Sequence, residues 1–126
     1  MKKVFLVDSS VLIDFLRRKD KKEAVFYKYL NRGVILASSE ITVAEIFAGK
    51  SMEKEELIGL VEKMFKNMRL VFGSWEIAVK TGELLRKDKD LGFQDAWIAA
   101  TALVKDWPVL TLNKKDFGRI PGVKLA

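Results

Sequence analysis

The sequence predicts an α/β fold, an α/β/α sandwich in which helices flank a mostly parallel central sheet of four or five strands. Short apolar runs rich in β-branched residues alternate with longer segments whose apolar residues recur every three or four positions. This alternation is typical of parallel strands joined by helices. The first run, over residues 4–7, has no polar residue, which indicates a strand buried on both faces. The length of 126 residues suits one domain, over residues 1–126.

The first half of the chain predicts two strands and three helices, each with a boundary signal. They are a strand over 2–8, a helix from Ser9 or Ser10 to about 18, a helix over about 23–31, a strand over 34–37 and a helix over about 41–48. Arg32-Gly33 is a stop signal for the second helix. Ser38-Ser39 can cap the third helix, and Gly49 closes it.

The second half continues the alternation. It predicts a helix over 53–68, a strand over 70–72, a helix that begins after Ser74, a polar break over 87–92, a helix over 94–105, a strand over 108–111, a loop over 113–118 and a last edge strand over 123–125. The helix over 53–68 has the clearest pattern, because Leu57, Leu60, Val61 and Met64 recur at helical spacing.

The composition excludes several kinds of site. The chain has no Cys and no His, so it has no disulfide, no thiolate nucleophile and no Ser-His-Asp triad. A metal ion would have to be bound by oxygen atoms, which favours a hard cation such as Mg²⁺ or Mn²⁺.

The charge balance is basic, with 23 Lys and Arg against 17 Asp and Glu and a net charge of +6. This excess suits a polyanionic partner, although solvated surface lysines explain it equally well. No stretch resembles a signal peptide or reaches the roughly 20 apolar residues that span a bilayer. We therefore expect a cytoplasmic protein with no membrane partner.

Four carboxylates stand out because of where they lie. Asp8 ends the buried first strand, and Glu45 lies in a helix that is apolar on nearly every side. Asp95 is in the first turn of a second apolar helix, and Asp116 follows a strand. Asp8 and Asp95 also have an ordinary explanation at a helix N-terminus, Asp116 as a turn residue, and Glu45 as part of a narrow exposed stripe.

Taken together, the four acids indicate a metal site. Strand ends and helix N-termini meet at one edge of a parallel sheet, where Asp8, Asp95 and Asp116 are expected and where Glu45 can face them. Crowded carboxylates repel one another, and a divalent cation reverses that effect. Such a site suits the attack of a metal-activated water on a phosphodiester, which needs no His.

Four stretches of the chain resemble, in order, the motifs of PIN-domain ribonucleases, and more narrowly those of VapC toxins from toxin–antitoxin pairs. The stretches are residues 6–14, 42–45, 95–102 and 111–117. The resemblance implies a nuclease that cuts RNA endonucleolytically with Mg²⁺ or Mn²⁺. It also implies a homodimer that is held inactive by a VapB-type antitoxin.

The same resemblance implies a role for particular residues. Asp8 and Asp95 would be the principal metal ligands, with Glu45 and Asp116 completing the acidic cluster. Asn113 would hydrogen-bond beside Asp116.

Three further polar residues are expected to support the site. Ser10 matches a small polar position that contacts the first acid of the family motif. Lys114 and Lys115 lie beside the predicted site and are candidate phosphate contacts. The basic run over 17–22 is either another RNA contact or a solvated connector.

Other functions fit the residues less well. A phosphatase or phosphotransferase with Asp8 as nucleophile would need a second acid two residues later, where this chain has Ser10. A receiver-type module would not explain Glu45 in an apolar helix. A PIN domain that acts in RNA processing or maturation remains an alternative to a toxin.

Overall fold

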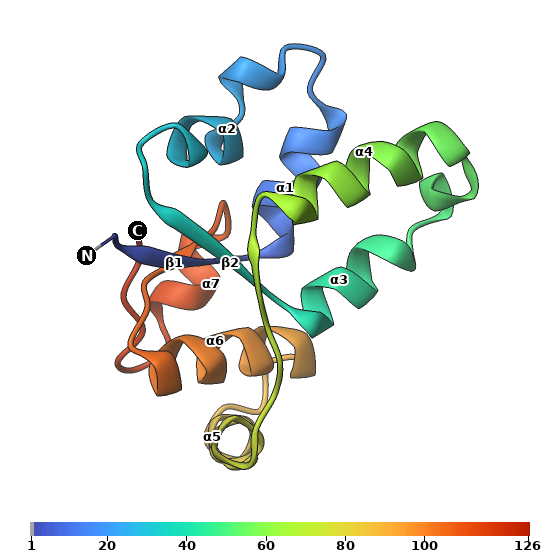
Figure 1. Ribbon diagram of the computed structural model, residues 1–126. Coiled ribbons are helices and arrows are strands. Elements are labelled where there is room, and N and C mark those ends of the chain that lie inside the picture. Colours follow the sequence, from blue (N-terminus) through green and yellow to red (C-terminus); the bar gives the residue numbers. More distant parts are fainter. Residues whose placement is uncertain (1) are drawn as a thin grey trace.

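The computed structural model describes residues 2–126, and its centre is a parallel sheet in the order β3-β2-β1-β4 (Figure 1). The strands are β1 (Val4–Val7), β2 (Ile35–Ser39), β3 (Arg69–Val71) and β4 (Val109–Leu110). Val4 pairs with Ile35, and Leu6 pairs with Val109. The predicted parallel sheet of four or five strands is confirmed as a sheet of four.

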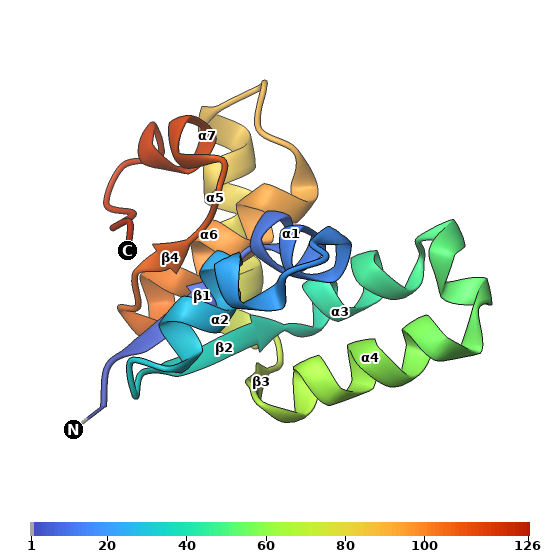
Figure 2. The ribbon, with the colours of Figure 1, turned by 90° about the horizontal axis from the view of Figure 1, so that it is seen from above.

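Helices cover both faces of this sheet (Figures 1 and 2). They are α1 (Ser9–Arg17), α2 (Val25–Leu30), α3 (Glu40–Phe47), α4 (Glu55–Lys66), α5 (Trp75–Lys87), α6 (Phe93–Lys105) and α7 (Lys114–Gly118), with the short 3₁₀ turns η1 (Lys21–Glu23) and η2 (Lys50–Glu53). Residues of α1, α2 and α4 form one core layer, and residues of α5, α6 and α7 form the other. The α/β/α sandwich is thus confirmed.

Several boundaries differ from the prediction. The segment over 113–118, predicted as a loop, contains α7, because the Asn113 carbonyl accepts from two amides and Phe117 is buried beneath it. The predicted last strand is only one parallel bridge, between Val109 and Leu125. The helix predicted over 53–68 begins at Glu55, after η2 has buried Met52. Among residues 2–126, no helix is long and apolar enough to cross a membrane.

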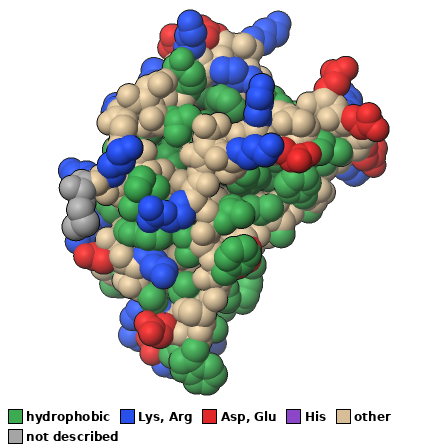
Figure 3. Space-filling view, in the orientation of Figure 1, with side chains coloured by type: hydrophobic (Ala, Val, Ile, Leu, Met, Phe, Trp, Pro, Cys, Tyr) green, Lys and Arg blue, Asp and Glu red, His purple; other side chains and the backbone are tan. Residues whose placement is uncertain are grey.

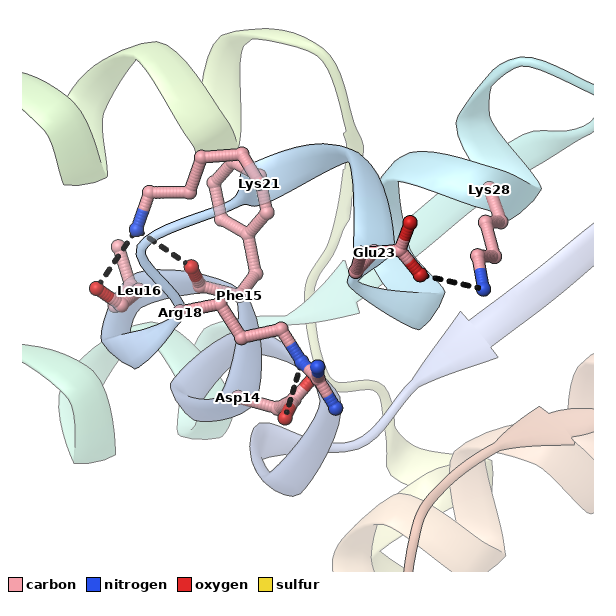
Figure 4. A network of polar contacts seen from close by, with 7 residues as sticks. All are labelled: Asp14, Phe15, Leu16, Arg18, Lys21, Glu23 and Lys28. Carbon is pink, nitrogen blue, oxygen red and sulfur yellow. Dashed lines mark hydrogen bonds and ion pairs between the residues drawn. The ribbon is translucent and has the colours of Figure 1, made fainter.

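The basic connector after α1 is partly used by the fold itself (Figure 4). Lys21 Nζ donates to the carbonyl oxygens of Phe15 and Leu16, at 2.7 and 2.9 Å. It thereby satisfies two carbonyls at the end of α1, where a positive charge is also favoured. Arg18 Nε lies 3.0 Å from Asp14 Oδ1, one turn earlier on α1.

A buttress of three residues joins α3, α6 and the segment before α5. Glu40 accepts a hydrogen bond from the Gly73 amide at 2.8 Å and from Trp97 Nε1 at 3.2 Å. A Cβ on Gly73 would lie 2.9 Å from Cη2 of Trp97 and closer still to its Cζ2, so the indole rests directly on the glycine. The buttress fixes the spacing of α3 and α6, and these helices carry Glu45 and Asp95.

The buttress predicts strong coupling between Gly73 and Trp97. Gly73→Ala should lower the free energy of unfolding by about 1–3 kcal/mol, because its methyl group overlaps the indole. In a Trp97→Phe background the two overlapping ring atoms are gone, so the same change should cost much less. Urea unfolding of the wild type, both single variants and the double variant measures this coupling. Additive effects of the two substitutions would contradict the contact.

Candidate active site

Asp8 lies at the carboxyl edge of the sheet, between β1 and α1. Its backbone occupies the N-cap position of α1, but its side chain makes no capping hydrogen bond. Asp8 as a residue is 4% exposed, and its carboxylate turns toward Thr111 at the end of the neighbouring strand β4. The capping explanation for Asp8 is therefore wrong.

Two hydroxyl groups hold one oxygen of Asp8. Ser10 Oγ donates to Asp8 Oδ2 at 2.7 Å, and Thr111 Oγ1 donates to the same atom at 2.9 Å. Each hydroxyl also accepts a backbone amide, from Leu112 at 3.0 Å and from Asn113 at 2.9 Å. These amides direct both hydroxyl protons at Asp8. Among residues 2–126, nothing hydrogen-bonds Asp8 Oδ1, which is left available to a ligand.

Glu45 faces this site from α3 and is half-buried. Ser9, the first residue of α1, donates to Glu45 Oε2 at 3.3 Å. Burial raises the pKa of Glu45, the charge of Asp8 raises it further and Asp95 adds to the effect, while the Ser9 hydrogen bond opposes them. Glu45 is therefore directed at the other acids and does not form a separate exposed stripe.

Asp95 reaches the same edge from the first turn of α6. Burial raises its pKa, and the charges of Asp8 and Asp116 raise it further, while Arg119 lowers it. Asp116 is exposed on α7 and lies at the margin of the group. The fold thus brings the four predicted acids within electrostatic reach of one another.

The acids are near one another without being closed around a common point. Within residues 2–126, no three carboxylates lie close enough to ligate one ion in their present positions. The donor set nevertheless suits a hard divalent cation, because it consists of oxygen atoms whose mutual repulsion a cation would relieve. Asp8 Oδ1 is the available oxygen at its centre. The assignment of Asp8, Glu45, Asp95 and Asp116 as metal ligands stays a prediction.

The residues expected to support the site differ in whether their side chains contact an acid. Ser10 contacts Asp8 as expected. Asn113 contacts Asp116 through the backbone, since the Asp116 amide donates to the Asn113 carbonyl at 3.1 Å. A side-chain bond between these two residues does not occur in the part of the chain that the structure describes. Lys114 and Lys115 are exposed in the first turn of α7.

Three contributors to the site were missed in the sequence. Thr111 braces Asp8, Ser9 holds Glu45, and Arg119 pairs with Asp88 at 3.3 Å while lowering the pKa of Asp95. Thr111 directly follows β4, which pairs with β1, so the order of the strands could have pointed to its position beside Asp8. For Arg119, no local pattern points to Asp95.

Comparison with known proteins shows which family the chain belongs to. The sequence pattern of the PIN domain matches residues 5–123. The chain belongs to the PIN domain family. The ribonuclease VapC1 of Methanocaldococcus jannaschii is 32% identical over 120 residues, which cover 91% of this chain and 79% of that protein.

A sequence and a solved structure from Salmonella typhimurium are also similar over nearly the full length. The tRNA(fMet)-specific endonuclease VapC is 28% identical over 127 residues, which cover 96% of this chain and 95% of that protein. A crystal structure of DNA-bound VapBC superposes with a TM-score of 0.82 at 29% identity, covering 100% of this chain and 98% of that one. These likenesses confirm the resemblance of this PIN domain chain to the VapC type.

The raised pKa values predict how stability depends on pH without divalent metal. The folded chain holds protons on Glu45 and Asp95 that the unfolded chain releases above about pH 4. Because of these two groups, the free energy of unfolding should fall as pH rises from about 4 through the raised pKa values of the folded chain. Asp95→Asn removes one of them, so its Tm in EDTA near neutral pH should rise by roughly 2 °C.

A suitable control for this substitution lies at the other end of the same helix. Asp106 follows the last residue of α6 and has a left-handed φ of 57°, which Asn also tolerates. Asp106 is exposed, and its ion pair with Lys124 at 3.3 Å lies on the surface, so Asp106→Asn should leave the Tm in EDTA nearly unchanged. A lower Tm for Asp95→Asn in EDTA would contradict the repulsion described above.

Proposed function

We propose that this chain is a Mg²⁺- or Mn²⁺-dependent endoribonuclease and the toxin of a VapBC-type pair. The observation that carries the proposal is the bracing of Asp8, whose Oδ2 is saturated by two hydroxyls while its Oδ1 is available. Membership of the PIN domain family supports it. Residues 1–126 act as one catalytic domain, and the enzyme works in the cytoplasm, where RNA is found.

We assign each residue of the site a role in phosphodiester hydrolysis. Asp8 and Asp95 would hold the cation, and Glu45 and Asp116 would complete its surroundings. A divalent cation held there would supply a water molecule of lowered pKa and neutralise charge on the phosphate. Ser10 and Thr111 orient Asp8, because each donates its hydroxyl proton to the carboxylate. Lys114 and Lys115 bind RNA phosphates beside the site.

The rival assignment as an Asp-nucleophile phosphatase is weaker. That chemistry requires an acid two residues after Asp8 to protonate the leaving group. Ser10 occupies this position, and its hydroxyl proton is already donated to Asp8.

A VapB-type antitoxin is the proposed protein partner. The similar Salmonella structure is described as VapBC. In this chain, α3 and α4 extend together from the sheet as an arm (Figures 1 and 2). A hollow of about 250 Å³, lined largely by apolar residues of α1, α3, η2 and α4, separates the arm from α1 and includes Glu45. A helix of the antitoxin would find an apolar surface there, next to the acids.

We also propose a homodimer, through an apolar face formed by Phe47, Leu70, Phe72, Trp75 and Val79. Apolar side chains run down this side of the molecule, over β3 and toward α5 (Figure 3). Phe72 is 68% exposed and Trp75 is 83% exposed. Beside them, Phe47 and Leu70 border a hollow that Phe65 and Met68 also line. Projecting rings and a hollow on one face suit a two-fold contact between identical chains.

RNA cleavage tests the proposed activity. Asp8→Asn keeps the shape of the side chain but removes the charge that binds the cation, so cleavage should fall at least about 100-fold. EDTA should abolish wild-type cleavage, and added Mg²⁺ or Mn²⁺ should restore it. Cleavage products of a labelled RNA, resolved on a gel, give the rates.

Controls separate this result from misfolding and from a general change in charge. Asp106→Asn makes the same substitution at the opposite edge of the sheet and should cleave like the wild type. Thermal melts of both variants establish that they fold. Equal cleavage by Asp8→Asn and wild type, or full activity in EDTA, would refute the proposed function.

The dimer has its own test. Trp75→Ser combined with Phe72→Ser should shift the molar mass measured by light scattering from that of two chains to that of one. Leu125→Ser, beside β4 on the side of the sheet away from β3, should leave the mass unchanged. An unaltered mass for the double variant would rule out this face as the interface.

A further inference from the structure

A further hollow, of about 470 Å³, lies between α1 and the segment that follows β4. It shares Ile13 and Arg17 with the hollow beside the arm, so Arg17 stands where the two hollows meet. On α1 the further hollow is lined by Ser10, Ile13, Asp14 and Arg17, which stand at the i, i+3, i+4 and i+7 spacing of one helix face. Because the Ser10 hydroxyl donates to Asp8, one end of the hollow adjoins the proposed catalytic carboxylate.

The opposite wall of this hollow combines an exposed apolar side chain with polar backbone. Leu112 is 47% exposed there, and Asn113 lies next to it. The Leu112 amide is already bonded to Ser10, so the wall is tied to the first turn of α1. An apolar wall that faces a cation suits a nucleotide, whose base is apolar on its faces and whose phosphate is anionic.

The cation of the hollow is Arg17. Arg18 also borders the hollow, but its guanidinium points back at Asp14, with Nε 3.0 Å from both carboxylate oxygens (Figure 4). That pair is close to neutral. Arg17 is exposed at the last turn of α1 and makes no hydrogen bond or ion pair through its side chain within residues 2–126. Arg17 therefore supplies the net positive charge.

We propose that this hollow is a subsite for the RNA backbone, and that Arg17 binds a phosphate in it. The inference rests on the proposed nuclease function and adds where the RNA lies. Arg17 stands seven residues after Ser10, which is roughly 10 Å along the helix. The phosphate at Arg17 thus belongs to a neighbouring nucleotide of the strand, and the scissile phosphate lies at Asp8. The RNA then runs along α1, between Arg17 and the lysines of α7.

Binding of a fluorescent single-stranded RNA oligonucleotide, measured by anisotropy in EDTA so that no turnover is needed, tests the subsite directly. Arg17→Gln should weaken binding about 3- to 10-fold at low salt and reduce the slope of log K against log salt by about 0.7, the loss of one phosphate contact to single-stranded RNA. Arg17→Lys should restore most of the affinity, because it restores the charge. Thermal melts of both variants should match the wild type.

Arg32 provides the matched control. It lies in the turn before β2, at the opposite edge of the sheet, and its guanidinium stacks on Tyr29 at 4.2 Å. Arg32→Gln changes the net charge equally but should alter the affinity less than twofold. Equal losses for Arg17→Gln and Arg32→Gln would mean a diffuse charge effect and would overturn the subsite, as would an unchanged affinity for Arg17→Gln.

Cleavage kinetics separate this proposal from the function on which it depends. With Mg²⁺, Arg17→Gln should raise KM for the RNA and leave kcat within about twofold, since the contact is remote from the bond that breaks. A chain that binds RNA through Arg17 but never cleaves it would refute the nuclease function and leave the subsite standing. If Arg17→Gln and Arg32→Gln both cleave RNA with the same KM, the subsite is refuted and the nuclease function stands.

Discussion

The whole candidate site depends on the two hydroxyl hydrogen bonds that hold Asp8. A buried carboxylate at a strand end is costly unless it is hydrogen-bonded, and here both donors have their protons directed by backbone amides. The same contacts tie the first turn of α1 and the segment after β4 to the end of β1. The backbone thus sets the position of the central acid through two short side chains, Ser10 and Thr111.

The surrounding acids work against the stability of the fold. Burial and mutual repulsion raise the pKa of Glu45 and Asp95, so their ionised forms are disfavoured where they stand. Helices α3 and α6 nevertheless keep them there, because Glu40 and Trp97 lock the two helices through Gly73. The packing of Trp97 on Gly73 offsets this local electrostatic cost, which a bound cation would relieve.

Much of this arrangement follows from local sequence, and the rest follows from contacts between distant segments. The apolar run before Asp8 predicted its strand end, and the apolar helix around Glu45 predicted that this acid faces inward. Ser10 lies two residues from its partner, so its contact was within reach of a motif. Thr111 meets Asp8 from 103 positions away, through the pairing of β4 with β1. Trp97 meets Glu40 from 57 positions away, and no local pattern encodes that contact. The short helix α7 was missed because its stability comes from burying Phe117.

The basic residues after α1 show why a run of charge cannot be interpreted as a unit. Lys21 satisfies the carbonyls that end α1, and Arg18 is held by Asp14, so both serve the fold. Arg17 differs because it makes no side-chain hydrogen bond or ion pair within residues 2–126 and, like Ser10, borders the hollow beside Asp8. Neighbouring residues of the same charge therefore have different roles, because they make different contacts. A sequence pattern alone assigns all of them equally to solvent or to RNA, whereas their contacts leave Arg17 as the residue of the three that is free to bind a ligand.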